Sequence, residues 1–127
     1  MLTINALVAS DSLLVPLQCE FFALEGLSQL LVIFDRVRDS FNNLLEIQGV
    51  VLTMYDKRNN LSEQVAEDVR KHLGSKVYDT VIPRNVRVSE APSFGKPVLL
   101  YDLHCAGAQA YAHLASEMLK REGINVL

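Results

Sequence analysis

The sequence predicts an α/β fold in which helices flank a parallel sheet. Three short segments rich in apolar and β-branched residues alternate with three longer segments whose apolar residues recur every three or four positions. This alternation is the pattern of βαβ crossovers, which set neighbouring strands parallel. The chain has 127 residues, half of them apolar, and a chain of this size buries about two-thirds of its unfolded surface in one core. We therefore expect residues 1–127 to form a single domain.

The predicted strands lie near residues 13–18, 47–54 and 76–82. The first, LLVPLQ, is a short apolar run that contains a proline. The second, IQGVVLTM, is apolar without alternation, which is typical of a parallel strand covered on both faces. The third, KVYDTVI, is rich in valine and isoleucine. A sheet of three strands has two open edges, so we expect the isolated chain to self-associate or to be marginally stable.

Helices are predicted over residues 23–40 and 60–73. The first segment carries a broad stripe of leucine, phenylalanine and valine at helical spacing. In the second, apolar residues recur every four positions, Asn60 and Glu63 are placed as a capping pair, and Gly74 ends the helix. Each segment should therefore bury one face against the sheet.

A third helix is predicted over residues 106–122, with Glu117 and Arg121 paired at i, i+4 and Gly123 closing it. The residues expected to face inward are Tyr111, Leu114, Ala115, Met118 and Leu119. The opening segment, residues 2–9, also has a helical pattern, but no strand precedes it. This order indicates that the chain begins inside a larger architecture.

The longest segment without a regular period covers residues 83–105 and holds three of the four prolines. Long irregular segments tend to carry function because their side chains are not needed for the core. Taken alone, the tetrapeptide PRNV at 83–86 indicates a proline-initiated turn into a short helix at 85–90. The basic residues of this region are, on the same basis, solvated surface charges.

Composition and motifs exclude several kinds of site. Residues 55–96 hold eight basic and six acidic residues, and an excess of two charges is weak evidence for an anionic partner. Cys19 and Cys105 have no metal-ligand or CxxC spacing, so both are expected to be packed thiols of a reducing, cytosolic protein.

No glycine belongs to a phosphate-binding motif and no triad pattern is present, so no catalytic residue or metal site is predicted. The apolar stretches near the N-terminus are too short for a membrane span.

Three blocks of the sequence resemble one known family. They are LTINALVASDSLLVPLQCEFFALEGL at 2–27, GVVLTMYDKRNNLSEQVAEDVRKHLG at 49–74 and IPRNVRVSEAPSFGKPVLLYD at 82–102. In this order they closely resemble the C-terminal half of the ParA/Soj partition ATPases, relatives of MinD in the deviant-Walker P-loop group. The resemblance implies the C-terminal part of a P-loop NTPase fold, a Rossmann-like three-layer architecture. The family's KGGxGKT motif belongs to an N-terminal half that precedes these blocks, so the Walker A half is absent from this chain.

The resemblance also implies a nucleotide-binding region. The residues that match the family's loop beside the adenine base are Pro83, Arg84, Asn85 and Val86. There the proline packs on the base and main-chain polar groups read it. The family binds ATP and Mg²⁺, but no cofactor is expected for this chain alone, and Gln18 near the nucleotide-responsive strand end has no assigned catalytic role.

A DNA-binding surface is implied in the same way. Arg58 matches an arginine of the family implicated in nonspecific DNA binding, and Arg87 and Lys96 match or adjoin basic positions of that surface. Arginine near a helix N-terminus offers both a charge and free amides to a phosphate. The implied partners are therefore nonspecific DNA, a ParB-like centromere-binding protein and a second copy of the chain.

The leading interpretation is a cytoplasmic, nucleoid-associated partition ATPase that lacks its P-loop half, so that this chain alone does not hydrolyse ATP. The alternative is a non-enzymatic, truncated remnant that acts as a DNA-binding or protein-interaction module. Membrane cycling of the MinD kind would need an amphipathic anchor. The tail KREGINVL is too short for one, so no membrane partner is expected.

Overall fold

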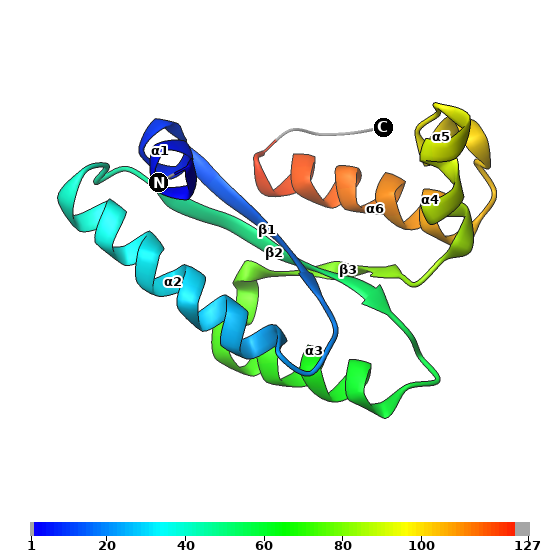
Figure 1. Ribbon diagram of the computed structural model, residues 1–127, viewed down its shortest axis with the longest axis horizontal. Helices are drawn as coiled ribbons and strands as arrows, with labels where there is room; N and C mark the ends of the chain where they lie inside the picture. The colour runs from blue at the N-terminus through cyan, green and yellow to red at the C-terminus, as the bar shows by residue number, and fades with distance from the viewer. Residues whose placement is uncertain (1, 124–127) are drawn as a thin grey trace.

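The structure is a computed structural model that describes residues 2–123 (Figure 1). Its elements, in chain order, are α1 (Leu2–Ala9), β1 (Ser12–Gln18), α2 (Ala23–Ser40), β2 (Glu46–Tyr55), α3 (Asn60–Leu73), the 3-10 turn η1 (Gly74–Lys76), β3 (Val77–Pro83), α4 (Val86–Glu90), the 3-10 turn η2 (Ala91–Phe94), α5 (Val98–Tyr101) and α6 (Ala106–Arg121). The three strands form one sheet in the order β1-β2-β3, and both pairs are parallel. The predicted α/β fold with a parallel sheet is confirmed.

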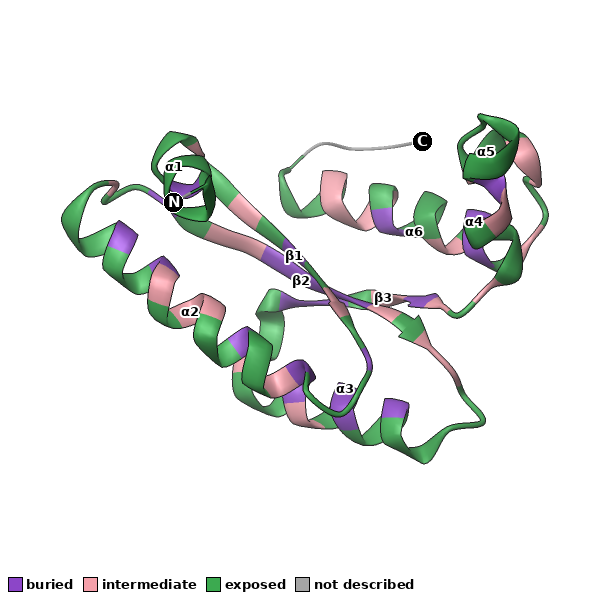
Figure 2. Cartoon of the chain, viewed as in Figure 1, coloured by how far each residue is buried: buried purple, intermediate pink, exposed green. Residues whose placement is uncertain are grey.

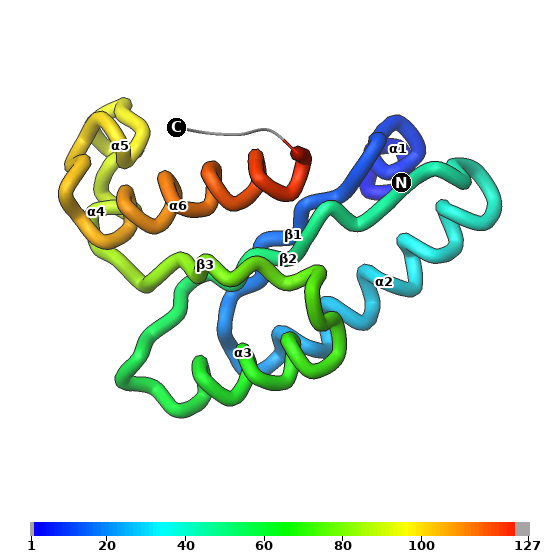
Figure 3. The backbone as a smooth tube through the Cα atoms, turned by 180° about the vertical axis from the view of Figure 1, so that it is seen from behind, coloured from blue at the N-terminus to red at the C-terminus, as the bar shows by residue number. Residues whose placement is uncertain are grey.

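Helices cover the two faces of the sheet unequally. α2 and α3, which connect the strands, lie on one face and enclose the main core around Val15, Leu52 and Val69. α6 lies on the opposite side of β3 from α3 (Figures 1 and 3), where Leu114 packs with Tyr78. A fully buried Val or Leu side chain contributes on the order of 1.5 to 3 kcal/mol, so most of the stability comes from the face under α2 and α3.

The other face of the sheet is covered at β3 and open at β1 (Figure 2). Burial alternates along β1: Val15 is buried beneath α2, whereas Leu14 and Pro16 on the opposite face are exposed. Among the helices of residues 2–123, α6 makes its main strand contacts on this face with β3. A half-apolar sheet face normally packs against a further layer, so the surface beside β1 is available for one.

Two side chains of α6 occupy the outer edge of β3. Glu117 accepts hydrogen bonds from the backbone N–H of Asp79 at 2.8 Å and of Thr80 at 2.9 Å. Arg121 donates to the carbonyl of Val77 at 2.9 Å and pairs with Glu117 at 3.2 Å, as its spacing predicted. These bonds replace those of a neighbouring strand, so the first half of this edge is closed.

β2 carries a bulge at its carboxyl end. Leu52 pairs with Val81 and Tyr55 pairs with Pro83, so three steps along β2 match two steps along β3. Met54, inside the bulge, has a φ of +54°, a left-handed conformation that costs a non-glycine residue on the order of 1 kcal/mol. Bulges of this kind often lie next to binding sites because they redirect side chains.

The bounds of the long elements agree closely with the sequence prediction. α2 and α3 cover the predicted residues 23–40 and 60–73, and Gly74 ends α3 with a φ of +57°. α6 ends at Arg121, one residue before the predicted bound. The third strand begins one residue late because Lys76 completes the preceding 3-10 turn.

The expectation that residues 83–105 are irregular is wrong. Most of this segment forms α4, η2 and α5, each of four or five residues. The short helix expected at 85–90 is confirmed as α4, with Asn85 as its N-cap. Helices of one turn are too short to show a helical period in a sequence, which is why the pattern missed the other two.

The predicted cap of α3 is also wrong. Asn59, not Asn60, is the N-cap: its backbone is extended and its side-chain oxygen accepts a hydrogen bond from the N–H of Leu61 at 2.9 Å. Asn60 is the first helical residue. Two adjacent asparagines are equally good N-cap residues by type, so the sequence could not separate them.

Two of the residues expected to face inward on α6, Tyr111 and Ala115, are exposed. α6 rests mainly on one strand, so it buries a narrower face than a helix between two strands would. Cys19 is buried as expected, and burial raises the pKa of its thiol. Cys105 is half-buried and has a further role, because its sulfur accepts a hydrogen bond from the N–H of Ala108 at 3.4 Å and so caps α6.

Replacing Glu117 with glutamine should lower the free energy of unfolding at pH 7 by about 1 to 3 kcal/mol, because a charged acceptor of several hydrogen bonds is lost. Partial burial raises the pKa of Glu117, but the bonds from Thr80 and Asp79 and the charge of Arg121 outweigh it, so this pKa lies below its usual value. A depressed pKa stabilises the fold above the unfolded value of about 4.3 and ceases to do so as the pH falls through the folded value. Urea unfolding of both proteins between pH 7 and pH 3 should therefore show a difference that shrinks in acid.

The matched control is Glu67→Gln, which removes a carboxylate from an exposed position on α3. It should change stability by less than about 0.5 kcal/mol. A Glu117→Gln effect no larger than this control, or one that does not change with pH, would show that the carboxylate does not hold the β3 edge.

Candidate functional site

The carboxyl ends of the three parallel strands lie at one end of the sheet, and this is where open α/β sheets bind ligands. β1 ends at Gln18, β2 at Tyr55 and β3 at Pro83. Parallel pairing brings Gln18 beside Thr53 and Tyr55 beside Pro83. Polar and apolar side chains from three segments that are distant in the sequence therefore lie close together at the ends of β1, β2 and β3.

A cavity of about 240 Å³, which we call the strand-end cavity, lies at this point. Its lining residues are Pro16, Gln18, Thr53, Met54, Ile82, Pro83, Asn85, Val88, Ser89 and Tyr111. They come from all three strands, α4 and α6, on the face of the sheet that is open over β1. The volume falls below the roughly 300 to 1,000 Å³ of pockets that enclose a drug-sized ligand, so these residues can enclose only part of a nucleotide.

Asn85 is fixed in this cavity by its own helix and by α6. Its side-chain oxygen accepts a hydrogen bond from the N–H of Arg87 at 2.9 Å, which caps α4. Gly107 on α6 allows the close approach, because a Cβ there would overlap Val88 and would lie 3.4 Å from the side chain of Asn85. α6 therefore determines where α4 and its cap lie.

The structure separates the four residues that the resemblance assigns to the base. Pro83 and Asn85 share the strand-end cavity. Arg84 lines a different cavity on the outer side of β3, and its N–H donates to the carbonyl of Tyr55 at 2.9 Å. Val86 is 70% exposed. Two of the four thus lie together, and Pro83 contributes to both cavities.

Arg58 lies in the loop between β2 and α3, where its side chain is 92% exposed. Asp56 accepts a hydrogen bond from its backbone N–H at 3.0 Å and lies 3.4 Å from its side chain. This backbone bond, the guanidinium of Arg58 and the charge of Arg84 together hold the pKa of Asp56 below its usual value. An exposed ion pair of this kind is weak because solvent screens both charges, so Arg58 can leave it at little cost.

Arg87 is held more firmly than Arg58. Its guanidinium lies 3.5 Å from Glu90 and 3.6 Å from Asp102, and Tyr101 donates a hydrogen bond to Glu90 at 2.8 Å. Tyr101, followed by Glu90 and Asp102, raises the pKa of Arg87. Two carboxylates therefore compete with any anion that approaches this arginine.

Lys96 lies in the turn between η2 and α5 and is exposed. Arg87 and Lys96 belong to the α4–α5 segment, whereas Arg58 belongs to the loop before α3, and Figure 1 shows these two segments apart at the same end of the molecule. A ligand that touches all three must be extended.

Sequence reasoning missed Met54, Thr53, Ser89 and Tyr111 as cavity residues. The positive φ of Met54 could not be predicted from the residue type, because methionine rarely adopts a left-handed backbone conformation. Tyr111 was expected in the core, and it reaches the cavity only because α6 leaves the β1 side of the sheet open.

The described residues contain no group of three or more His, Cys, Asp or Glu side chains arranged to hold a metal ion. None of the helices within residues 2–123 is long and apolar enough to cross a membrane. Half of the tail considered above as a membrane anchor, residues 124–127, lies outside the described residues.

Comparisons with known proteins agree with this geometry. A family model described as an AAA domain matches residues 1–47. In a structural comparison, 96% of the chain superimposes on 42% of cobyrinic acid a,c-diamide synthase from Mycobacterium smegmatis, solved with bound ADP and magnesium, with a TM-score of 0.71 and 30% identity. This likeness identifies the fold as that of a P-loop NTPase.

Several relatives match almost the whole chain, among them proteins of Caulobacter vibrioides and Bacillus subtilis. The chromosome partitioning protein ParA of Caulobacter vibrioides is 74% identical over 121 residues, which are 95% of this chain and 45% of that protein. The sporulation initiation inhibitor protein Soj of Bacillus subtilis is 58% identical over 118 residues, which are 93% of this chain and 47% of that protein. The chain thus spans a little less than half the length of these relatives, and over that span its sequence matches the ParA/Soj family.

Proposed function

We propose that residues 1–127 are the C-terminal portion of a ParA-like ATPase domain, and that the phosphate-binding half packs against the open face of the sheet. The observation that carries this proposal is the strand-end cavity, which holds Pro83 and Asn85 beside the uncovered strand β1. The relatives support it, because this chain matches only 45% and 47% of their lengths. A nucleotide would then lie between the two halves.

This chain would bind the base end of that nucleotide. Pro83 offers an apolar surface to one face of the base, and the fixed side chain of Asn85 borders the same cavity. Main-chain groups between Arg84 and Val86 would read the edge of the base. ATP with Mg²⁺ supplies the transferable phosphoryl group and the compensating charge in this chemistry. The other half of the domain would hold the phosphates and the metal, so we assign no catalytic residue and no metal ligand to this chain.

The whole protein would act as a ParA-type partition ATPase in the cytoplasm, on the nucleoid. ATP would drive a homodimer that coats DNA without sequence preference, and a ParB-like centromere-binding protein would stimulate hydrolysis and so move chromosome or plasmid copies apart. The names of the relatives, chromosome partitioning protein ParA and Soj, support this function. Arg58, Arg87 and Lys96, all exposed, would contact the DNA backbone.

A second candidate is a non-enzymatic DNA-binding or protein-interaction module. The observation that favours it is that all the proposed DNA-contacting residues lie in this chain, whereas this sequence contains no phosphate-binding motif. An isolated module of this kind would keep a surface for DNA and lose the ATP cycle. ATP hydrolysis therefore distinguishes the two candidates.

The purified 127-residue chain should release no phosphate above background with Mg²⁺ and ATP, with or without DNA. Loss of single charged groups at such sites can cost roughly a thousandfold in rate, and here the whole phosphate-binding half is missing. Addition of the separately expressed N-terminal half of the Caulobacter relative should restore turnover, and the same half with its P-loop lysine replaced by alanine should not. Turnover by the chain alone that survives repeated purification would contradict the proposal.

Arg58→Glu should weaken binding to any duplex without changing sequence preference. Each lost phosphate contact reduces the slope of log K against log salt by about 0.9. The measurement is a salt titration of DNA binding with ATP, in the chain completed by the N-terminal half of the Caulobacter relative. Lys120→Glu, an exposed lysine in the last turn of α6, is the matched control. Equal slopes for the wild type and Arg58→Glu would remove Arg58 from the DNA surface.

Glu90→Gln should strengthen DNA binding by the completed chain about two- to fivefold, because it removes a carboxylate that competes with phosphate for Arg87. Glutamine keeps an oxygen that can accept the hydrogen bond of Tyr101. Glu67→Gln makes the same change of net charge on α3 and should have a smaller effect. If Glu90→Gln and Glu67→Gln bind DNA equally well, the guanidinium of Arg87, freed from Glu90, does not contact DNA.

A further inference from the structure

A second cavity, of about 610 Å³, lies on the other side of Pro83 from the strand-end cavity, and we call it the β3-edge cavity. The loop after β2, the carboxyl half of β3 and the first half of α6 form its wall. Pro83 is the one residue common to the two linings. The volume lies within the roughly 300 to 1,000 Å³ of pockets that enclose a small molecule.

An added peptide strand does not fit this edge of β3. Glu117 and Arg121 already occupy the backbone groups of the first half of the strand. In the second half Pro83 has no N–H to donate, and a proline on an edge strand prevents continued pairing. The geometry of the edge therefore favours a small molecule in the cavity.

The charges of the wall favour an anion. Lys57 and Arg84 both line the cavity, and neither forms an ion pair within the described chain. Asp56 is the one carboxylate of the lining. Arg58, which lies outside the lining, donates a backbone hydrogen bond to it at 3.0 Å and lies 3.4 Å from it, and the charge of Arg84 also acts on it. The lining therefore holds two cations against one carboxylate. A phosphate monoester carries about −1.5 to −2 at pH 7 and is attracted by this excess of positive charge.

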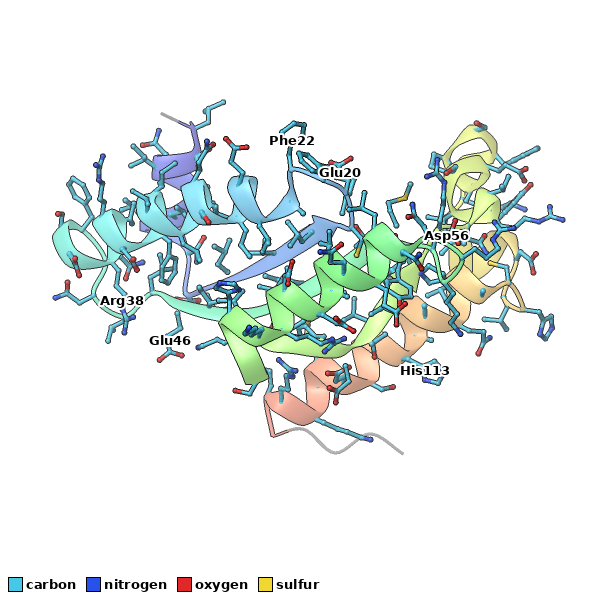
Figure 4. The ribbon with its side chains drawn as sticks, turned by 90° about the horizontal axis from the view of Figure 1, so that it is seen from below. Glu20, Phe22, Arg38, Glu46, Asp56 and His113 are labelled. Carbon is cyan, nitrogen blue, oxygen red and sulfur yellow. The ribbon has the colours of Figure 1, made fainter. Side chains whose placement is uncertain are left out.

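The rest of the wall favours a ligand with an apolar ring. Tyr55, Val81 and Pro83 provide apolar surface on one side of the cavity, and two alanines of α6 continue it. The uncharged polar groups of the lining include Gln109, whose side-chain N–H donates to the carbonyl of Leu103 at 2.7 Å. His113, one helical turn further along α6, lines the same cavity as Asp56, and Figure 4 shows both residues at the same end of the molecule. Such a mixed lining is typical of sites for small molecules.

We propose that the β3-edge cavity binds a small aromatic phosphate monoester, with its phosphate on Lys57 and Arg84 and its ring on the apolar wall around Tyr55 and Val81. The guanidinium of Arg84 can hold two phosphate oxygens at once, and the ammonium of Lys57 supplies a second charge. This site is distinct from the strand-end cavity, and its occupation requires neither ATP nor DNA.

The test uses the 127-residue chain and phenyl phosphate as the probe, with affinity measured by saturation-transfer NMR and by ³¹P line broadening. Arg84→Gln and Lys57→Gln should each weaken binding about tenfold, the loss of one charged hydrogen-bond partner. Lys57 lies in an exposed loop, so its replacement should leave the circular dichroism spectrum unchanged even if Arg84→Gln disturbs the fold. Lys120→Gln, which removes an equal charge outside the wall, should leave the affinity unchanged.

Two control ligands and one further variant complete the experiment. Inorganic phosphate and benzyl alcohol should each bind at least tenfold more weakly than phenyl phosphate, because each lacks one of the two parts the cavity holds. Ser89→Ala, in the strand-end cavity, should not alter the affinity. The proposal is overturned if Lys57→Gln binds as well as the wild type, if benzyl alcohol binds as tightly as phenyl phosphate, or if Ser89→Ala removes binding.

Discussion

The attachment of α6 to the outer edge of β3 is the constraint on which both cavities depend. Glu117 and Arg121 bond to the strand backbone where a neighbouring strand would otherwise pair. Once α6 is fixed there, Gly107 near its start holds α4 against it and thereby positions Asn85. The opposite side of α6 presents Gln109 and His113 to the β3-edge cavity. The ion pair of Glu117 and Arg121 near the end of α6 thus helps to position polar groups near the start of the same helix.

The uneven cover of the sheet gives the chain a closed core on one face and an open cavity on the other. The face under α2 and α3 is closed by apolar residues of all three strands, which gives the chain a core of its own. The other face is closed by α6 over β3 and over Val51 of β2, whereas the strand-end cavity lies open beside Leu14 and Pro16 of β1. This surface is apolar, is only partly covered, and lies beside the polar side chains of the strand-end cavity. Such a surface is more typical of an interface with a further structural layer than of a closed active site.

The sequence predicted those features that depend on repetition over many residues. α2, with 18 residues, and α3, with 14, are long enough for their apolar periods to predict the correct bounds, and the apolar runs predicted the parallel strands. Features decided by one residue were not predictable. The choice of Asn59 over Asn60 as a cap and the left-handed backbone of Met54 are set by tertiary packing. The strand-end cavity escaped prediction for that reason, because Met54 and Tyr111 carry no sequence signal for it.

Arginines of one chain can differ widely in how freely they can bind an anion, because their carboxylate neighbours differ. For this reason a cluster of basic residues in a sequence is weak evidence for an anion-binding site. Arg58 extends into solvent beside one carboxylate, whereas Arg87 lies between two. Arg84 follows the strand end and turns to the side of β3 away from Asn85, although the two are adjacent in the sequence. The direction is set by Pro83, whose backbone ends the strand and whose ring borders both cavities. A single proline at the end of β3 therefore lies between the strand-end cavity and the β3-edge cavity and borders both.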